Sequence, residues 1–228
     1  MTRSIVAVAL LTAVCCQAAR AQVPGSPTRF EISGGLLMTG GTDFGSKVGA
    51  LTANNPGDPD FALFRTATTL GRGAGVEGRL SVNLTKVVAV EGAFSWLRQT
   101  AETRVTADVE VPDVTLTQKL DTYVIEGAAV VRVTSLAFDH GRGMPFVFAG
   151  GGYVRQLDDQ RLLTGSGQVF DAGGGVKYFF IQRPRGFVRA LGIRADGRVI
   201  VRSGGFDPSG DGASRATWGL LAGVVTRF

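Results

Sequence analysis

The chain has 228 residues, a formal net charge of +5 and 44% hydrophobic residues, and 33 of its residues are glycine, about twice the usual share. No apolar run reaches the roughly 18 residues that a membrane-spanning helix needs, which excludes a helical membrane protein. The modest positive charge is scattered along the chain, so we predict no nucleic-acid partner.

The first 21 residues have the pattern of a secretory signal peptide. Arg3 is basic, residues 5–16 are apolar, and residues 19–21 read Ala-Arg-Ala, a small-x-small cleavage site. Both cysteines, Cys15 and Cys16, lie in this leader, so we expect a mature chain without disulfides or thiolate metal sites. An acylated cysteine, as in a lipoprotein, is the alternative interpretation of the leader.

Alternation of apolar and polar residues predicts eight β-strands in the remaining domain, residues 22–228. In the stretch VVAVEGAFSW, for example, Val90 and Phe94 take one face while Glu91 and Ser95 take the other. Each predicted strand is long enough for the roughly 9–11 residues of a tilted membrane strand. The predicted strands span residues 28–41, 71–84, 87–96, 123–133, 145–156, 167–180, 187–201 and 214–228.

The predicted connections alternate in length along the chain. Short ones lie at 83–86, 134–144 and 181–186, and long polar ones lie at 41–69, 98–118, 157–166 and 203–213. Short turns at one end and longer loops at the other are typical of an up-and-down membrane barrel, in which the turns are periplasmic. We therefore predict an all-β fold, an eight-stranded antiparallel up-and-down transmembrane β-barrel with both termini on the periplasmic side.

One face of these strands carries charges that cannot point into lipid, because a basic side chain near the membrane midplane costs about 2–4 kcal/mol. We expect them inside a barrel whose lumen is just wide enough for side chains to fill. The predicted lumen charge cluster consists of Glu77, Arg79, Glu91, Glu126, Arg132, Lys177, Arg194, Asp196 and Arg198. With Glu31 and Asp171 also facing inward, acids and bases nearly balance, which predicts mutual pairing. A narrow ion path, gated by pairs that exchange partners, is the alternative.

The chain ends in GLLAGVVTRF, residues 219–228, with apolar residues at alternate positions before a terminal phenylalanine. Together with the leader and the eight strands, this resembles small outer-membrane β-barrel proteins of the type seen in the transmembrane domain of outer membrane protein A. The resemblance implies an outer-membrane location, contact with outer-membrane lipid, and a last strand that the barrel-assembly machinery recognises. The residues that match this assembly signal are Trp218, Leu220, Val224 and Phe228. An ordinary edge strand of a soluble protein is the alternative interpretation of this stretch.

One stretch contains a residue type that is common in catalysis. The chain has one histidine, His140, beside Asp139 in a short connection on the predicted periplasmic side. Barrel hydrolases resemble one another in using a histidine base, but the proteases among them keep their site at the outer rim. We therefore predict no catalytic residue, no cofactor and no enzymatic activity.

Residues 207–212 partly match a calcium loop, with Asp207, Ser209, Asp211 and Gly212 at the first, third, fifth and sixth positions. The motif requires a glutamate at its twelfth position, where this chain has Trp218. We predict a plain hairpin loop and no metal site, with a weak calcium contact as the alternative.

Two functions are consistent with this sequence. The first is a structural or surface-interaction barrel with a closed, salt-bridged lumen, which contacts an unidentified ligand through its outer loops. The long segment 41–69 is the best candidate surface. The second is a small channel that passes ions or small solutes. The first needs permanent pairing of the lumen charges, and the second needs a continuous water path.

Overall fold

The computed structural model describes residues 30–51, 61–107, 112–158, 163–183, 186–206 and 212–228. The predicted signal peptide, residues 1–21, lies outside these ranges and stays a prediction. No helix in the described ranges is long and apolar enough to cross a membrane. The elements are β1 (Phe30–Thr39), β2 (Thr42–Leu51), β3 (Phe61–Leu70), β4 (Gly73–Asn83), β5 (Val88–Thr106), β6 (Val114–Arg132), a 3₁₀ helix η1 (Thr134–Leu136), β7 (Gly143–Asp158), β8 (Leu163–Gln182), β9 (Ala190–Gly204) and β10 (Arg215–Arg227).

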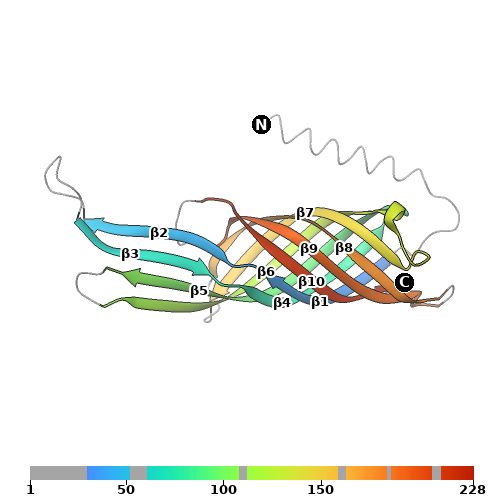
Figure 1. Ribbon diagram of the computed structural model, residues 1–228, viewed down its shortest axis with the longest axis horizontal. Coiled ribbons are helices and arrows are strands. Elements are labelled where there is room, and N and C mark those ends of the chain that lie inside the picture. The colour runs from blue at the N-terminus through green and yellow to red at the C-terminus, as the bar shows by residue number, and fades with distance from the viewer. Residues whose placement is uncertain (1–29, 52–60, 108–111, 159–162, 184–185, 207–211) are drawn as a thin grey trace, which may run out of the picture.

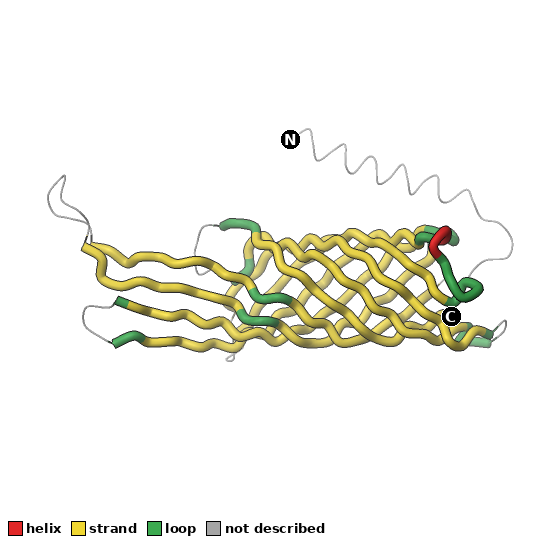
Figure 2. The backbone as a smooth tube through the Cα atoms, in the orientation of Figure 1, coloured by secondary structure: helices red, strands yellow, loops and turns green. Residues whose placement is uncertain are grey.

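Eight of the strands close into an antiparallel barrel (Figure 1). The first strand, β1, pairs with both β4 and the last strand β10, and the circle continues through β9, β8, β7, β6 and β5 back to β4. Figure 2 shows that the wall is almost entirely strand. Closure pairs the backbone N–H and C=O groups around the whole ring, which a sheet in lipid requires. The structure confirms the predicted barrel and its eight strands.

The barrel wall is apolar outside and polar inside. On β1, Ile32 and Leu36 are 50% and 68% exposed, whereas Glu31 and Ser33 are buried. The same exposure of apolar side chains recurs on the other seven strands, at Leu80, Phe94, Ile125, Val147, Phe170, Ile193 and Leu220. Exposed aromatic residues lie toward both ends of this belt, among them Tyr153 and Trp218 at one end and Phe30 and Phe180 at the other. This distribution is that of a membrane-spanning barrel.

Beyond the barrel wall, two strands occupy a segment that the sequence pattern assigns to a loop. The prediction of a long loop at 41–69 is wrong for most of its length, because β2 and β3 form a hairpin there. The outer part of β5 pairs with β3, from Arg65 opposite Thr106 to Leu70 opposite Ala101. Much of the predicted loop 98–118 likewise belongs to β5 and β6. These four strands form a sheet that projects from the barrel at the end opposite the C-terminus (Figure 1).

The loop prediction is wrong because the side chains of the projecting sheet are largely exposed. Residues 61–70 read FALFRTATTL and are rich in threonine and phenylalanine, which favour strands. Most of their side chains are at least partly exposed, so the alternation that marks a strand with one buried face is weak. Polarity alone therefore identified the segment as a loop.

Inward-facing glycines lie opposite large lumen side chains and let neighbouring strands approach closely. Gly75 is opposite Leu97 across β4 and β5, and Gly173 is opposite Arg198 across β8 and β9. A Cβ atom at Gly75 would lie 1.9 Å from the carbonyl oxygen of Trp96. The small diameter of the barrel thus depends on glycine at these positions.

We predict that Gly75→Ala prevents barrel formation, because the added methyl group has no space against a backbone oxygen that closure holds in place. Gly78→Ala on the same strand is the matched control, since a Cβ there faces outward and meets nothing within 4 Å. The measurement is the gel mobility of refolded protein with and without boiling, which separates folded from unfolded barrel. A Gly75→Ala variant that folds as fully as Gly78→Ala would contradict this account of the wall.

Candidate functional site

The lumen holds one connected network of twelve charged side chains among the described residues. All nine residues of the predicted lumen charge cluster belong to it, and no acid or base of the network is more than 18% exposed. Six acids, Glu31, Glu77, Glu91, Glu126, Asp171 and Asp196, meet six bases, Arg79, Arg132, Lys177, Arg194, Arg198 and Arg227. Their formal charges therefore sum to zero, and every barrel strand except β7 contributes at least one of them.

Glu91 on β5 contacts three bases of the network. Its carboxylate lies 2.9 Å from Arg194 Nη1, 3.1 Å from Lys177 Nζ and 3.3 Å from Arg79 Nη1. It also accepts a hydrogen bond of 2.7 Å from the hydroxyl of Ser81. These partners come from β4, β8 and β9, so this one carboxylate connects four strands across the lumen.

Arg198 on β9 connects a second group of acids. Its two terminal nitrogens bind the two oxygens of Glu77, each at 3.0 Å, which is the paired geometry that guanidinium and carboxylate groups favour. The same side chain lies 2.8 Å from Asp196 and 3.4 Å from Glu126. Arg79 also bonds Glu77, so the two parts of the network share residues.

Glu31 on β1 gathers three bases at the end of the lumen nearest the C-terminus. Lys177, Arg227 and Arg132 approach its carboxylate to 2.7, 2.8 and 2.9 Å. Arg227 was missing from the predicted lumen charge cluster, because it lies at the end of the last strand, where the sequence pattern gives no sign of burial. The only signal in the sequence for its place in the lumen is the alternation along the last strand, which puts Arg227 on the inward face.

The network rests against aromatic rings from β7, the strand that contributes no charge. The guanidinium of Arg194 lies 4.7 Å from the ring centre of Phe146, and that of Arg79 lies 5.3 Å from the ring centre of Phe148. Cation–π contacts of this kind stabilise desolvated cations. The sequence does not single out these two phenylalanines, because an inward-facing phenylalanine has the pattern of an ordinary core residue.

Asp171 is the acid with the weakest partners. Its carboxylate accepts no hydrogen bond, and the nearest cation is Arg198 Nη1 at 3.8 Å. Glu126 shares this cation, so the two acids compete for it. This part of the lumen is the least tightly paired region of the network.

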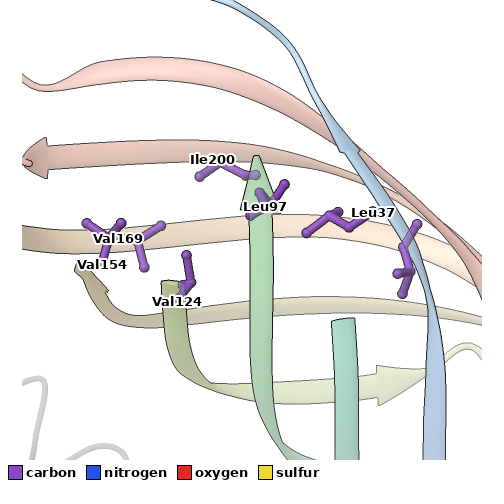
Figure 3. Close-up of a cluster of buried hydrophobic side chains, with 7 residues drawn as sticks. Leu37, Leu97, Val124, Val154, Val169 and Ile200 are labelled. Carbon is purple, nitrogen blue, oxygen red and sulfur yellow. The ribbon is translucent and has the colours of Figure 1, made fainter. Parts of the chain in front are cut away.

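A layer of buried apolar side chains lies in the lumen directly outside the charges (Figure 3). On several strands it occupies the next inward-facing position, for example Val124 after Glu126 and Ile200 after Arg198. The layer consists of Leu37, Leu97, Val124, Val154, Val169, Ile200 and Leu221, none more than 7% exposed. A hydrated ion that passed along the axis would have to cross this layer as well as the network.

His140 lies where the sequence predicted it, in the connection between β6 and β7. Its side chain is fully exposed, and its Nδ1 atom lies 3.8 Å from Asp139. The hydroxyl of Tyr178 donates a 2.7 Å hydrogen bond to Asp139, and this bond lowers the pKa of that carboxyl. The histidine is thus separated from the charges of the lumen.

The candidate calcium loop lies only partly within the described residues. No group of three or more histidine, cysteine, aspartate and glutamate side chains in the described ranges is arranged to hold a metal ion. Residues 207–211 of the candidate calcium loop lie outside those ranges. The twelfth position, Trp218, points outward from the barrel and is 43% exposed.

The last strand presents the predicted assembly pattern on the outside of the barrel. Trp218, Leu220 and Val224 are 43%, 54% and 51% exposed on the apolar face. The terminal residue is tied to the first strand, because the N–H of Phe228 donates to the carbonyl of Phe30 at 3.0 Å. Recognition of this pattern by the assembly machinery stays a prediction.

Comparison with known proteins finds no matching family model and no matching curated protein. The structure is similar to the outer membrane protein OprG from Pseudomonas aeruginosa, with a TM-score of 0.50 and 11% identity over 88% of this chain and 96% of that chain. A weaker similarity is to Ail of Yersinia pestis, with a TM-score of 0.41 and 13% identity over 89% of this chain and 100% of that chain. Another is to the Escherichia coli outer membrane protease OmpT, with a TM-score of 0.40 and 7% identity over 91% of this chain and 99% of that chain. At these sequence identities, the similarity shows a shared fold.

The closed barrel, its apolar outer belt and its charged lumen define the class of this protein. Such a surface is stable only in a bilayer, and closed antiparallel barrels of this kind are the strand-built proteins of outer membranes. The chain is an eight-stranded outer-membrane β-barrel protein.

Proposed function

We propose that the protein is a barrel with a permanently closed lumen, whose role is carried by the part that projects beyond the membrane. The projecting sheet would bind a partner or ligand at the cell surface, and the barrel would anchor that sheet. The observation that carries this proposal is the filling of the lumen by a neutral ion-pair network and an adjoining apolar layer. We propose no enzymatic activity, because the one histidine of the sequence, His140, is exposed on a turn and lies apart from the ionisable groups of the lumen.

Closure is supported by the way the pairs share residues. Arg198 contacts Glu77, Asp196 and Glu126 at once, so moving it would remove one basic partner from each of these buried acids. Removing one partner from a buried pair costs about 3–5 kcal/mol. A path that opened by exchange of partners would require several such losses together.

An outward role is supported by the two free edges of the projecting sheet. Within the described residues, β2 pairs only with β3, and the outer part of β6, residues 114–119, pairs only with β5. Leu116 and Val114 on that edge are 60% and 40% exposed. Unpaired strand edges with exposed apolar side chains are surfaces on which another strand can add.

The channel is the second candidate function, and the weak pairing of Asp171 favours it. A carboxylate that accepts no hydrogen bond is a natural place for an ion path to begin. The assembly signal formed by Trp218, Leu220, Val224 and Phe228 applies to either function, and we propose that it directs insertion into the outer membrane.

Planar-bilayer conductance separates the two functions. We predict that the refolded protein is silent, and that Glu126→Ala is silent too, because Arg79 and Arg198 keep their other acids. Insertion must be shown on the same sample by the gel shift on boiling. Discrete current steps that change in Glu126→Ala would contradict the closed lumen and favour the channel.

The orientation of the projecting sheet can be tested by cysteine labelling of intact cells, since the only cysteines of the sequence are at positions 15 and 16. We predict that Lys47→Cys, exposed on β2, reacts with a membrane-impermeant maleimide. Lys86→Cys, in the turn between β4 and β5, should react only after the outer membrane is permeabilised. The unsubstituted protein serves as the blank, and the reverse labelling pattern would contradict the proposed orientation.

A further inference from the structure

The short connections at the end of the barrel where the C-terminus lies carry more exposed bases than acids (Figure 1). They join β4 to β5, β6 to β7 and β8 to β9, and their described residues are 84–87, 133–142, 183 and 186–189. Asp139 is the one acid among these described residues. Each connection has at least one exposed base, and together these bases form what we call the basic rim: Lys86, Arg142, Arg183 and Arg189.

Most bases of the rim have no acid to pair with. Within the described part of the chain, Lys86, Arg183 and Arg189 form no salt bridge. Arg142 has a distant partner, because its Nη1 atom lies 4.0 Å from the carboxylate of Asp139. That carboxylate already accepts a 2.7 Å hydrogen bond from the hydroxyl of Tyr178. The rim therefore keeps most of its positive charge for a group outside the protein.

The turn that carries Lys86 is held in shape by its neighbour Thr85. The hydroxyl oxygen of Thr85 accepts hydrogen bonds from the N–H groups of Val87 at 3.1 Å and Val88 at 2.9 Å. The carbonyl oxygen of Lys86 accepts a hydrogen bond of 3.4 Å from Arg132 Nη1. These bonds fix the backbone and leave the lysine side chain exposed at the tip of the turn.

The connection that carries Arg142 folds back onto the lipid-facing side of the wall. The ring of Phe138 stacks on that of Tyr178, which points outward because its neighbour Lys177 points into the lumen. Gly143 makes room for this ring, since a Cβ atom there would lie 2.2 Å from it. Phe138 is still 48% exposed at the edge of the apolar belt. Arg142 thus borders the belt directly.

The other two bases also lie beside an exposed aromatic ring. The N–H of Arg183 donates to the carbonyl of Arg189 at 2.7 Å, which brings the two residues together. Phe187 in the same connection is 82% exposed, and its ring centre is 5.0 Å from that of Phe228. Aromatic side chains favour the boundary between the apolar part of a bilayer and its headgroups. Bases beside such rings lie at the level of the lipid phosphates.

We propose that the basic rim binds anionic phospholipid headgroups in the leaflet on its side, which is the inner, periplasmic leaflet in the orientation proposed above. A base that borders the apolar belt meets a lipid phosphate, and each such base favours a lipid of net negative charge by about fivefold. The rim includes no residue of the lumen network or the projecting sheet. The proposal therefore goes beyond the proposed function and does not depend on it.

The test is tryptophan quenching by brominated lipids in vesicles of equal phosphatidylglycerol and phosphatidylcholine, with the bromine on one lipid or the other. The reporter is Phe180→Trp, on the outward face of β8 beside the rim, in a chain whose own tryptophans are replaced by Trp96→Phe and Trp218→Phe. Both leaflets have the same composition, so the direction of insertion does not affect the result.

Two variants of this reporter chain differ in which exposed bases they lack. The rim variant carries Lys86→Gln, Arg142→Gln, Arg183→Gln and Arg189→Gln. The control variant loses the same charge from the projecting sheet, through Lys47→Gln, Arg65→Gln, Arg104→Gln and Lys119→Gln. The gel shift on boiling confirms that each variant folds.

We expect quenching that corresponds to about fivefold enrichment of phosphatidylglycerol over phosphatidylcholine beside the reporter. The enrichment should disappear in the rim variant and at about 1 M salt, where screening acts within about 3 Å, and it should remain in the control variant. Equal quenching by the two lipids, enrichment that survives in the rim variant, or an equal loss in the control variant would overturn the proposal. If the rim variant does not fold, the salt dependence of the reporter chain decides the question.

Discussion

The structure depends on one constraint: in the membrane-spanning part of a narrow barrel, a charged side chain can point only into the lumen. Lipid surrounds the wall, and the lumen of eight strands has little room for water. A charge placed there must find an opposite charge within a few ångströms. Six acids and six bases satisfy this requirement together, and the shared contacts of Glu91 and Arg198 make the result a network rather than a set of separate pairs.

This constraint is also the basis of the proposed outward-facing function. Paired charges and an adjoining layer of apolar side chains fill the lumen, and in the proposed function these side chains have a structural role, which is to hold the wall together. In the proposed function, contact with another molecule falls to the outer end, where two edges of the projecting sheet have no strand partner within the described residues. In that proposal, the barrel is the anchor that fixes the position of these edges.

The sequence predicts the barrel well because strand periodicity is a local property. Alternate residues point to opposite faces, so the inward position of Glu91 and the outward position of Phe94 follow from spacing alone. Which charges pair does not follow, because partners such as Glu31 and Lys177 are 146 residues apart and meet only through the strand register. The burial of Arg227 does not follow either, because it lies at the end of the last strand, and an inward-facing phenylalanine such as Phe146 has the pattern of an ordinary core residue. The hairpin of β2 and β3 was missed because its side chains are largely exposed, and exposure weakens the alternation.

The most direct test of the central claim is a double-mutant cycle on Glu77 and Arg198, measured as the free energy of unfolding in urea for barrels refolded into lipid vesicles. Glu77→Gln and Arg198→Gln should each destabilise the barrel by about 3–5 kcal/mol, because each removes one charge from a buried neutral network and leaves the opposite charge in excess. The double variant should cost less than the sum by at least about 2 kcal/mol, a coupling typical of residues in one network. Additive costs would show that the two charges do not depend on each other, and would contradict a lumen held together by its ion pairs.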